Sequence, residues 1–320
     1  MRALQVHELE GPHALRLVDD APEPERGDGV VIDVHAAGVA FPDVLLSRGL
    51  YQLKPDPPFT LGSEVAGTVT EGGDAFSAGE RVMAFTFGGF AERAAAPATM
   101  TFRLPEGWSF EEGAAFVMNY HTSHFALHRR GRMREGDTVI VHGAGGGVGS
   151  AAVQIAHGGG ARTIAVVSTD AKEEVARRAG ADEVVRTEGW LDAVRESTGG
   201  RGADIVLDPV GGERFADSVR ALAPEGRVLV VGFAEGEIPT LKVNRLLLRN
   251  ADVVGVAWGA FVGDKPDFSA EIQADLERLA AAGAVRPILD AEYRLEDGAA
   301  AVARLEERGA LGKVVVRVRD

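Results

Sequence analysis

The sequence contains no cysteine, and its basic side chains are outnumbered by acidic ones. Among 320 residues there are 34 Lys and Arg against 48 Asp and Glu, which gives a formal net charge of −14. The lack of cysteine excludes a disulfide framework, a thiolate nucleophile and a zinc site with cysteine ligands. The acidic excess argues against general nucleic-acid binding, because affinity for phosphate backbones is carried by Lys and Arg.

Long apolar runs are also missing. No window reaches the roughly 18 consecutive apolar residues of a membrane-spanning helix, and residues 1–20 place Glu, Arg, His and Asp where a signal peptide would be apolar. We therefore expect a cytoplasmic protein without a membrane partner. Hydrophobic residues make up 45% and charged residues 26% of the chain, as in ordinary globular proteins, and the length suits about two domains.

The first part of the chain reads as short strands and turns. Up to residue 115, short apolar or alternating runs are separated by Gly-Pro, Pro-Glu-Pro and Gly-Asp-Gly, which predicts a compact β-rich domain. Residues 53–62 contain three prolines and are expected to form an irregular loop. The expected strands are Arg2–Val6, Leu15–Val18, Gly29–Ala37, Gly62–Thr70 and Arg81–Phe87.

From residue 120 onward, apolar strands alternate with helical stretches. This alternation predicts a parallel sheet covered by helices on both faces, so the expected fold class is α/β. Residues 268–318 resemble neither part and read as helix, strand, helix, strand. The expected strands of the parallel sheet include Thr138–His142, Thr163–Ser168, Ala203–Asp208, Arg227–Gly232 and Ala251–Val256.

The strongest local signal is a glycine-rich segment between strand Thr138–His142 and an expected helix over Val148–His157. Aligned on the dinucleotide-binding pattern G-x-G-x-x-G, its key positions are Ala144, Gly146 and Gly149, with Gly147 and Val148 between the last two. Gly146 would let the backbone approach a pyrophosphate, and Gly149 would let the helix pack on the strand. The helix N-terminus would then attract the phosphates.

The end of the following strand distinguishes NAD from NADP. An acidic residue there would bind the ribose 2′-hydroxyl of NAD, but the expected position, 19 residues beyond Gly149, is Ser168. Ser168 and Thr169 can donate hydrogen bonds to a 2′-phosphate, and Lys172 adds positive charge, which favours NADPH. Asp170 is the competing acid, and we expect it to be the N-cap of the helix that begins at Ala171.

Several motifs together point to a known family. The chain reads Phe41-Pro-Asp-Val-Leu-Leu-Ser-Arg-Gly-Leu-Tyr51, Leu61-Gly-Ser-Glu-Val-Ala-Gly67 and Gly79-Glu-Arg-Val82, besides its Ala144–Gly149 motif. Over essentially its whole length it resembles the medium-chain dehydrogenase/reductase superfamily, in particular the zinc-free quinone oxidoreductase branch that includes zeta-crystallin.

The resemblance implies two domains and a homodimer. A GroES-like catalytic domain would comprise residues 1–122 and 266–320, and a Rossmann domain that binds NADPH would comprise residues 123–265. The cofactor would lie in the cleft between them. Two copies would join edge to edge through the last Rossmann strand, Ala251–Val256.

The resemblance also assigns cofactor and substrate residues. Tyr51 matches a tyrosine beside the nicotinamide that could donate a proton or hydrogen bond; the alternative is an aromatic side chain packed at the rim. Arg308 matches a basic residue that reaches the cofactor, and simple solvation is its alternative. The other matched cofactor residues are Thr122, Lys172, Gly232, Phe233, Ala234, Trp258 and Gly259.

Three departures from relatives bear on the substrate and the metal. Ala40 replaces an asparagine and Leu45 a tyrosine that many members have, so the pocket formed by Ala40, Phe41, Leu45 and Tyr51 becomes more apolar. This leaves room for longer enones or acyl thioesters. Zinc-dependent members carry Gly-His-Glu where this chain has Gly-Ser63-Glu, so no metal is expected.

The sequence thus predicts a zinc-independent, NADPH-dependent reductase that transfers hydride to a quinone or an α,β-unsaturated carbonyl compound. Such acceptors are already electrophilic and mainly need positioning and a proton. Two alternatives stay open: an enoyl-thioester reductase of the enoyl-CoA type, and a protein that binds NADPH without significant turnover.

Overall fold

The computed structural model describes residues 1–265 and 267–319, which divide into two compact units. Unit 1 contains residues 1–118, 267–273 and 287–319, and unit 2 contains residues 119–265 and 274–286. These units differ from the expected domains at residues 119–122 and 274–286, and the domain assignment itself stays a prediction.

Unit 2 is built on a six-stranded parallel sheet with the strand order β11-β10-β9-β12-β13-β14. The chain order reverses direction between β9 and β12, which is where open parallel sheets bind ligands beyond the carboxyl ends of their strands. The strands are β9 (Thr138–His142), β10 (Arg162–Val167), β11 (Glu183–Arg186), β12 (Ala203–Asp208), β13 (Leu222–Val230) and β14 (Asp252–Gly255).

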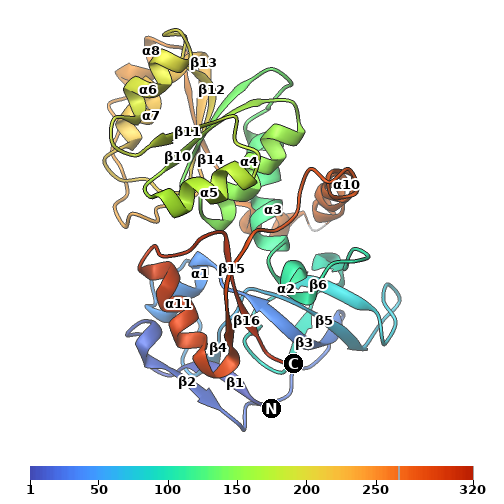
Figure 1. The fold of residues 1–320 in the computed structure, drawn as a ribbon. Helices are drawn as coiled ribbons and strands as arrows, with labels where there is room; N and C mark the ends of the chain where they lie inside the picture. The colour runs from blue at the N-terminus through green and yellow to red at the C-terminus, as the bar shows by residue number, and fades with distance from the viewer. Residues whose placement is uncertain (266, 320) are drawn as a thin grey trace. The chain divides into compact units, whose positions relative to one another are not determined.

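Five helices of unit 2 pack together in two groups. Helices α4 and α5 pack beside each other, and α6, α7 and α8 form a second group (Figure 1). The core includes Ile140, Ile164 and Val206 from the strands and Trp190 and Phe215 from the helices. The helices are α3 (Val117–His124), the π-helix η3 (Phe125–Arg130), α4 (Gly147–Gly158), α5 (Asp170–Arg178), α6 (Trp190–Ser197), α7 (Phe215–Arg220), α8 (Asn244–Leu247), α9 (Trp258–Asp264) and α10 (Phe268–Ala281).

Unit 1 contains two sheets, which confirms its β-rich character. A three-stranded sheet has the order β2-β1-β4, and a seven-stranded sheet has the order β15-β16-β3-β5-β6-β8, with β7 paired to β3. Most pairs are antiparallel, while β15 and β16 are parallel. The strands are β1 (Ala3–Val6), β2 (Leu15–Val18), β3 (Val30–Gly38), β4 (Phe59–Thr60), β5 (Glu64–Glu71), β6 (Arg81–Phe85), β7 (Arg93–Ala96), β8 (Thr101–Arg103), β15 (Leu289–Arg294) and β16 (Lys313–Arg317).

Two expectations for unit 1 were wrong. Residues 41–51 do not continue as strand and turn but begin with helix α1 (Phe41–Ser47), which Pro42 and the Asp43 carboxylate favour in its first turn. The loop 53–62 ends in β4, which pairs with β1. The remaining helices are η1 (Pro12–Ala14), η2 (Ala98–Met100), α2 (Phe110–Ala114), η4 (Leu295–Asp297) and α11 (Gly298–Glu306).

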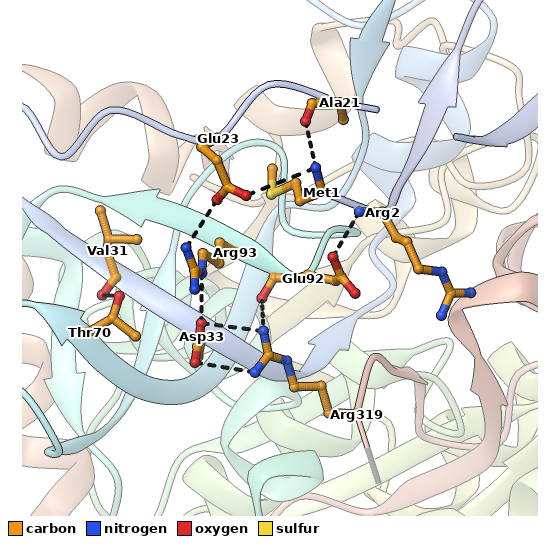
Figure 2. A network of polar contacts seen from close by, with 10 residues as sticks. All are labelled: Met1, Arg2, Ala21, Glu23, Val31, Asp33, Thr70, Glu92, Arg93 and Arg319. Carbon is orange, nitrogen blue, oxygen red and sulfur yellow. Dashed lines mark hydrogen bonds and ion pairs between the residues drawn. The ribbon is translucent and has the colours of Figure 1, made fainter. Parts of the chain in front are cut away.

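A polar network holds segments from both ends of the chain on the seven-stranded sheet (Figure 2). Arg319 contacts both carboxylate oxygens of Asp33 on β3, at 3.2 and 3.3 Å. Arg93 bridges the same Asp33, at 3.0 Å, and Glu23, at 3.3 Å. These exposed pairs each contribute little alone, but together they connect the end of β16 with β3 and β7. Among the described residues, no helix is both long and apolar enough to cross a membrane.

Candidate cofactor and substrate residues

The glycine-rich turn leads from the buried central strand β9 into helix α4. Gly143 adopts a left-handed conformation with φ 60°, and the amide of Gly146 donates to the Gly143 carbonyl at 3.0 Å. Gly146 is the N-cap of α4; it offers no side-chain cap, and the first turn has no acidic residue. The first amides of α4 can therefore serve an external anion.

The two pattern glycines differ in the space around them. A Cβ at Gly149 would lie 2.2 Å from the Gly143 carbonyl oxygen, so only glycine lets the helix pack this closely on the turn. A Cβ at Gly146 would meet nothing nearer than that same oxygen, at 3.5 Å, and residues 146–148 are partly exposed. The turn is closed toward the sheet and open at Gly146, as a backbone cradle for a pyrophosphate requires.

Other positions of the turn accept close neighbours that the sequence alone did not reveal. A Cβ at Gly147 would lie 2.4 Å from the side-chain nitrogen Nδ2 of Asn119 on α3. A Cβ at Gly145 would lie 2.5 Å from the Lys172 Cβ on α5. Ala144, in place of the first glycine, is fully buried. The Val148 carbonyl accepts a hydrogen bond from Ser123 at 3.0 Å. The turn thus holds α3 and α5 close to the start of α4.

The predicted phosphate-binding side chains lie together at the carboxyl end of β10. Ser168 and Thr169 are exposed directly after the strand, and the Lys172 ammonium donates to the Ser168 hydroxyl at 3.5 Å. Thr169 is the N-cap of α5 and accepts from the Lys172 amide at 3.3 Å. Together with the Gly145 contact, this places a hydroxyl and an ammonium beside the glycine turn.

Asp170 does not have the position expected for it. It is the first residue of α5 rather than its N-cap, a role that Thr169 takes because its hydroxyl reaches the Lys172 amide. The Asp170 carboxylate is fully exposed and forms an ion pair with Arg186 at the end of β11. Arg186 also pairs with Glu173. The acid that would oppose a 2′-phosphate is therefore offset by an arginine that sequence reasoning missed.

The turns after β12 and β13 pack along the same edge of the sheet. The Asp208 carboxylate accepts from the amides of Val210 and Gly211, both at 2.9 Å, and burial raises the pKa of this carboxyl. A Cβ at Gly143 would lie 3.2 Å from the side chain of Val210, and the Ala234 amide donates to the Pro209 carbonyl at 3.1 Å. The predicted cofactor residues Gly232, Phe233 and Ala234 therefore lie beside the turn after β12. That turn contacts the glycine-rich segment through Val210.

The remaining predicted cofactor residues lie in different settings. Trp258, at the start of α9, is buried, and its ring packs edge-on against His121 at 5.3 Å between centroids. Gly259 is exposed, and Thr122 on α3 is partly exposed. Arg308 follows α11 in unit 1 with a left-handed φ of 59° and is exposed. Cofactor contacts of these four residues stay predictions.

His124 on α3 and His128 on the following π-helix η3 form a local cluster with Asp275. His124 contacts Asp275 on α10 at 3.2 Å, and its ring lies 4.5 Å from that of His128. Burial, followed by the neighbouring His128, lowers the pKa of His124 to about 4. Across residues 1–265 and 267–319, no group of three or more His, Asp or Glu side chains has an arrangement that could hold a metal ion.

Unit 1 contains a buried polar group that we call the Asp43 cluster: Asp43, Ser63, Glu64 and Lys313. Asp43 on α1 accepts from the Ala40 amide at 2.8 Å and from the Ser63 hydroxyl at 2.9 Å. Its side chain is fully buried, and this burial raises its pKa to about 6. Ser63 therefore has its hydroxyl directed to a carboxylate.

The second acid of the Asp43 cluster has a cationic partner. Glu64 is fully buried, accepts from the Met118 amide at 3.0 Å and forms an ion pair with Lys313, which is almost fully buried on β16. The pair joins residues 249 positions apart. Such a contact favours a structural role for Glu64 over that of a general base. Asp43, Ser63 and Lys313 had not been singled out as a buried network, because no local pattern connects them.

The predicted substrate residues lie on or next to α1. Phe41 and Leu45 are four residues apart and partly exposed on one face of the helix, while Ala40 is its buried N-cap. Tyr51 is half-buried and packs against the core of unit 1. Burial, and then the negative charge of Asp43, raises the pKa of the Tyr51 phenol. Its predicted contact with substrate stays a prediction.

Comparison with known proteins identifies the class and then the branch. Residues 26–106 match the alcohol dehydrogenase GroES-like domain, and residues 147–280 match the zinc-binding dehydrogenase family. The chain is 35% identical to quinone oxidoreductase-like protein 2 of Rattus norvegicus, over 99% of this chain and 92% of that one. The unit 1 sheets and the parallel sheet of unit 2 are thus a GroES-like and a Rossmann-like fold.

Solved structures of relatives share this fold over almost the full length of the chain. A probable oxidoreductase from Mycobacterium abscessus is 44% identical, with a TM-score of 0.90 and coverage of 99% of each chain. The quinone oxidoreductase of Thermus thermophilus, also solved in complex with NADPH, is 35% identical, with a TM-score of 0.85 and coverage of 99% of this chain and 100% of that chain. The chain belongs to the zinc-free quinone oxidoreductase branch of the medium-chain dehydrogenase/reductase superfamily, a family of oxidoreductases.

Proposed function

We propose that this protein is an NADPH-dependent reductase in which unit 2 binds the cofactor. The glycine turn carries the proposal, since it is open at Gly146, closed at Gly149 and followed by a helix without a side-chain cap. Ser168 and Lys172 would hold the 2′-phosphate, and Arg186 would offset Asp170. The NADPH complex of the Thermus thermophilus relative supports the same cofactor.

The proposed acceptor is a quinone or an α,β-unsaturated carbonyl compound. When bound, NADPH supplies a hydride. The task of this chain's own residues is to orient the acceptor and to provide a hydrogen bond or proton at its carbonyl oxygen, for which Tyr51 is the candidate catalytic residue. The apolar side chains of Phe41 and Leu45 would favour an apolar acceptor.

The reaction is proposed to proceed without zinc. The position that holds a histidine ligand in zinc-dependent relatives is Ser63, whose hydroxyl is hydrogen-bonded to Asp43, and the neighbouring Glu64 is paired with Lys313. A quinone or enone is electrophilic without a Lewis acid, so these residues support hydride transfer to such acceptors rather than alcohol oxidation.

Steady-state NADPH oxidation tests the function. The acceptors would be 9,10-phenanthrenequinone, 1,4-benzoquinone, an alkenal and crotonyl-CoA, with and without a chelator. Turnover of a quinone or the alkenal that resists chelation is the expected result. Preference for crotonyl-CoA would instead identify an enoyl-thioester reductase. Tight NADPH binding with no turnover of any acceptor would contradict the proposal.

The choice of NADPH over NADH has its own test. Lys172→Ala should weaken NADPH binding by roughly tenfold or more, about 1.4 kcal/mol, and leave NADH binding nearly unchanged, because only the phosphate loses a charged partner. Lys242→Ala, at an exposed lysine of the same unit, is the matched control. Fluorescence titration gives both dissociation constants, and equal losses for the two cofactors would refute the assignment.

We further propose a homodimer through β14 and the segment before it, refining the predicted strand Ala251–Val256. Strand β14 is the last of its sheet on that side. The preceding segment exposes Val243, Leu247 and Leu248 to 74, 75 and 82%, and a group of exposed apolar side chains close together in the chain is typical of an interaction surface. Leu247→Asp with Leu248→Asp should yield a monomer by light scattering, whereas Leu50→Asp, at an exposed leucine of unit 1, should not.

A further inference from the structure

Two buried side-chain amides of unit 2 differ in their hydrogen bonds. The Oε1 of Gln154 on α4 accepts from the Tyr120 hydroxyl at 2.9 Å and from the Arg286 amide at 2.8 Å, and its Nε2 donates to the Arg286 carbonyl at 2.9 Å. Asn119 on α3 is only 5% exposed, yet its side-chain amide makes no hydrogen bond to any residue that the structure describes. Buried polar groups are ordinarily paired, so Asn119 calls for a partner from outside the chain.

Asn119 lies against the start of α4. A Cβ added to Gly147 would first meet the Nδ2 atom of Asn119, at 2.4 Å, whereas the Oδ1 atom lies 3.3 Å away. Gly147 is the first residue of α4, and no side chain caps this helix end. Because position 147 is glycine, the Nδ2 donor can lie directly beside the unpaired backbone amides of the first turn.

The side of α3 that contacts the glycine turn includes both Asn119 and Ser123. Ser123 donates to the Val148 carbonyl at 3.0 Å, and residues four apart share a helix face. Gly147 and Val148 are partly exposed, as is Gly146 before them. The unpaired amide atoms of Asn119 are not fully closed to solvent. The small exposed area of Asn119 thus includes its amide, next to the open part of the turn.

The hydrogen-bonding groups that meet at this point are donors. They are Nδ2 of Asn119 and the first backbone amides of α4, at the helix end that carries positive partial charge. The first turn of α4 contains no acidic residue. A ligand group that pairs with all of these donors needs several acceptor oxygens and a negative charge, and the pyrophosphate of a dinucleotide has both.

We propose that Asn119 is a cofactor-binding residue whose Nδ2 donates a hydrogen bond to the pyrophosphate of the dinucleotide, beside the first amides of α4. The inference rests on the cofactor binding of the proposed function but does not depend on turnover. NADPH and NADH share the pyrophosphate. Asn119 therefore adds affinity for both cofactors and leaves the choice between them to residues such as Lys172.

The first experiment compares Asn119→Leu with Gln154→Met, two changes of a buried amide to an apolar side chain of similar size. Asn119→Leu removes an unpaired polar group, so the melting temperature of the cofactor-free protein should stay the same or rise. The dissociation constants of NADPH and NADH should each rise about tenfold, with an unchanged ratio, because a hydrogen bond to a charged group is lost. Fluorescence titration measures both constants.

Gln154→Met is the matched control, since it removes an amide of the same unit that is already hydrogen-bonded within the chain. It should lower the melting temperature of the cofactor-free protein and leave both dissociation constants nearly unchanged. A leucine at position 119 can itself obstruct a ligand, so Asn119→Ala serves as a second variant that leaves the space open. It should show the same weakening of both cofactors as Asn119→Leu.

Fragments of the cofactor locate the contact. In Asn119→Ala, the 2′-phosphate derivative of ADP-ribose, which has the pyrophosphate but no nicotinamide, should lose affinity by the same factor as NADPH. Adenosine 2′-monophosphate, which has no pyrophosphate, should bind to Asn119→Ala and wild type equally. A loss confined to ligands that contain nicotinamide would overturn the pyrophosphate assignment.

Unchanged dissociation constants of both cofactors in folded Asn119→Ala would overturn the inference. So would a loss for NADPH alone, because the shared pyrophosphate could not then be the contact. A wild-type protein that binds neither cofactor would refute the inference together with the proposed function. The expected losses in a protein that reduces no acceptor would support the inference while refuting the proposed function.

Discussion

The glycine turn of unit 2 and the Asp43 cluster of unit 1 are built on opposite principles. The turn relies on backbone groups and on small residues, since five of its seven consecutive residues, Gly143 to Gly149, are glycine. The cluster consists of buried charged and polar side chains from three distant segments, with Glu64 and Lys313 lying 249 positions apart. A site made of backbone groups is specified by a short stretch of sequence, whereas a site made of side chains from distant segments forms only when the chain folds.

The two acids of the Asp43 cluster make a second, sharper contrast. Both are fully buried, but Glu64 has Lys313 as its ion-pair partner while Asp43 has two neutral donors. Burial raises the pKa of Asp43 to about 6. One carboxylate is therefore part of the framework, and the other retains a proton equilibrium near neutral pH.

Removing the cation of the framework pair should have the largest effect. Lys313→Ala leaves the Glu64 charge buried with the Met118 amide as a hydrogen-bond donor but without its cation, and should lower the free energy of unfolding by about 3–5 kcal/mol. Guanidinium denaturation measures the loss. Combining Lys313→Met with Glu64→Gln removes both charges and should recover most of it. A loss below about 1 kcal/mol in the single variant would show that the pair is not what holds this region.

Two alanine variants of the glycine turn distinguish its role in helix packing from its role in leaving space for the cofactor. Gly149→Ala places a Cβ 2.2 Å from a backbone oxygen and should destabilise the protein by up to about 3 kcal/mol. Gly146→Ala, with 3.5 Å to the nearest atom, should retain the melting temperature yet weaken NADPH binding severalfold. Differential scanning calorimetry and cofactor titration give the two readouts. Equal melting temperatures for both variants would contradict the packing argument.

The Asp43 charge should cost stability at neutral pH. Its folded pKa of about 6 exceeds its ordinary value of 3.8, so the folded state holds the proton more tightly and stability falls as pH rises through this window. Asp43→Asn should therefore raise the free energy of unfolding by up to about 3 kcal/mol at pH 8 and by almost nothing at pH 4. Urea denaturation at both pH values measures this, and a gain independent of pH would rule out the charge as its cause.

The smallest expected effect concerns a helix cap beside the cofactor residues. Thr169→Ala removes the acceptor of the Lys172 amide at the start of α5 and should cost about 1 kcal/mol of stability. It should also weaken NADPH binding slightly, because Lys172 lies in the first turn of α5, which loses its cap. Ser109→Ala removes a similar cap from α2 in unit 1 and should match the stability loss without affecting NADPH. A loss of NADPH affinity in both variants would make the effect nonspecific.

Prediction from sequence succeeded where the determinants were local. The Rossmann-like strands and the glycine turn were expected close to their observed positions, because continuous apolar runs and glycine spacing specify them within a few residues. Helix α1 was missed because its seven residues are too short for a clear periodicity, and its first turn depends on the buried Asp43. The cap of α5 was misplaced by one residue, since Thr169 and Asp170 are both good capping residues and only their geometry chooses between them.

The sequence by itself determined the two folds and the class of cofactor, because each depends on residue types in a short window. Only the tertiary structure decided that Arg186 offsets Asp170, that Lys313 is the partner of Glu64 and that Asp43 lies buried without such a partner. These facts depend on distances between segments far apart in the chain. Burial, which sets the cost of each charge, comes into existence only when those segments pack.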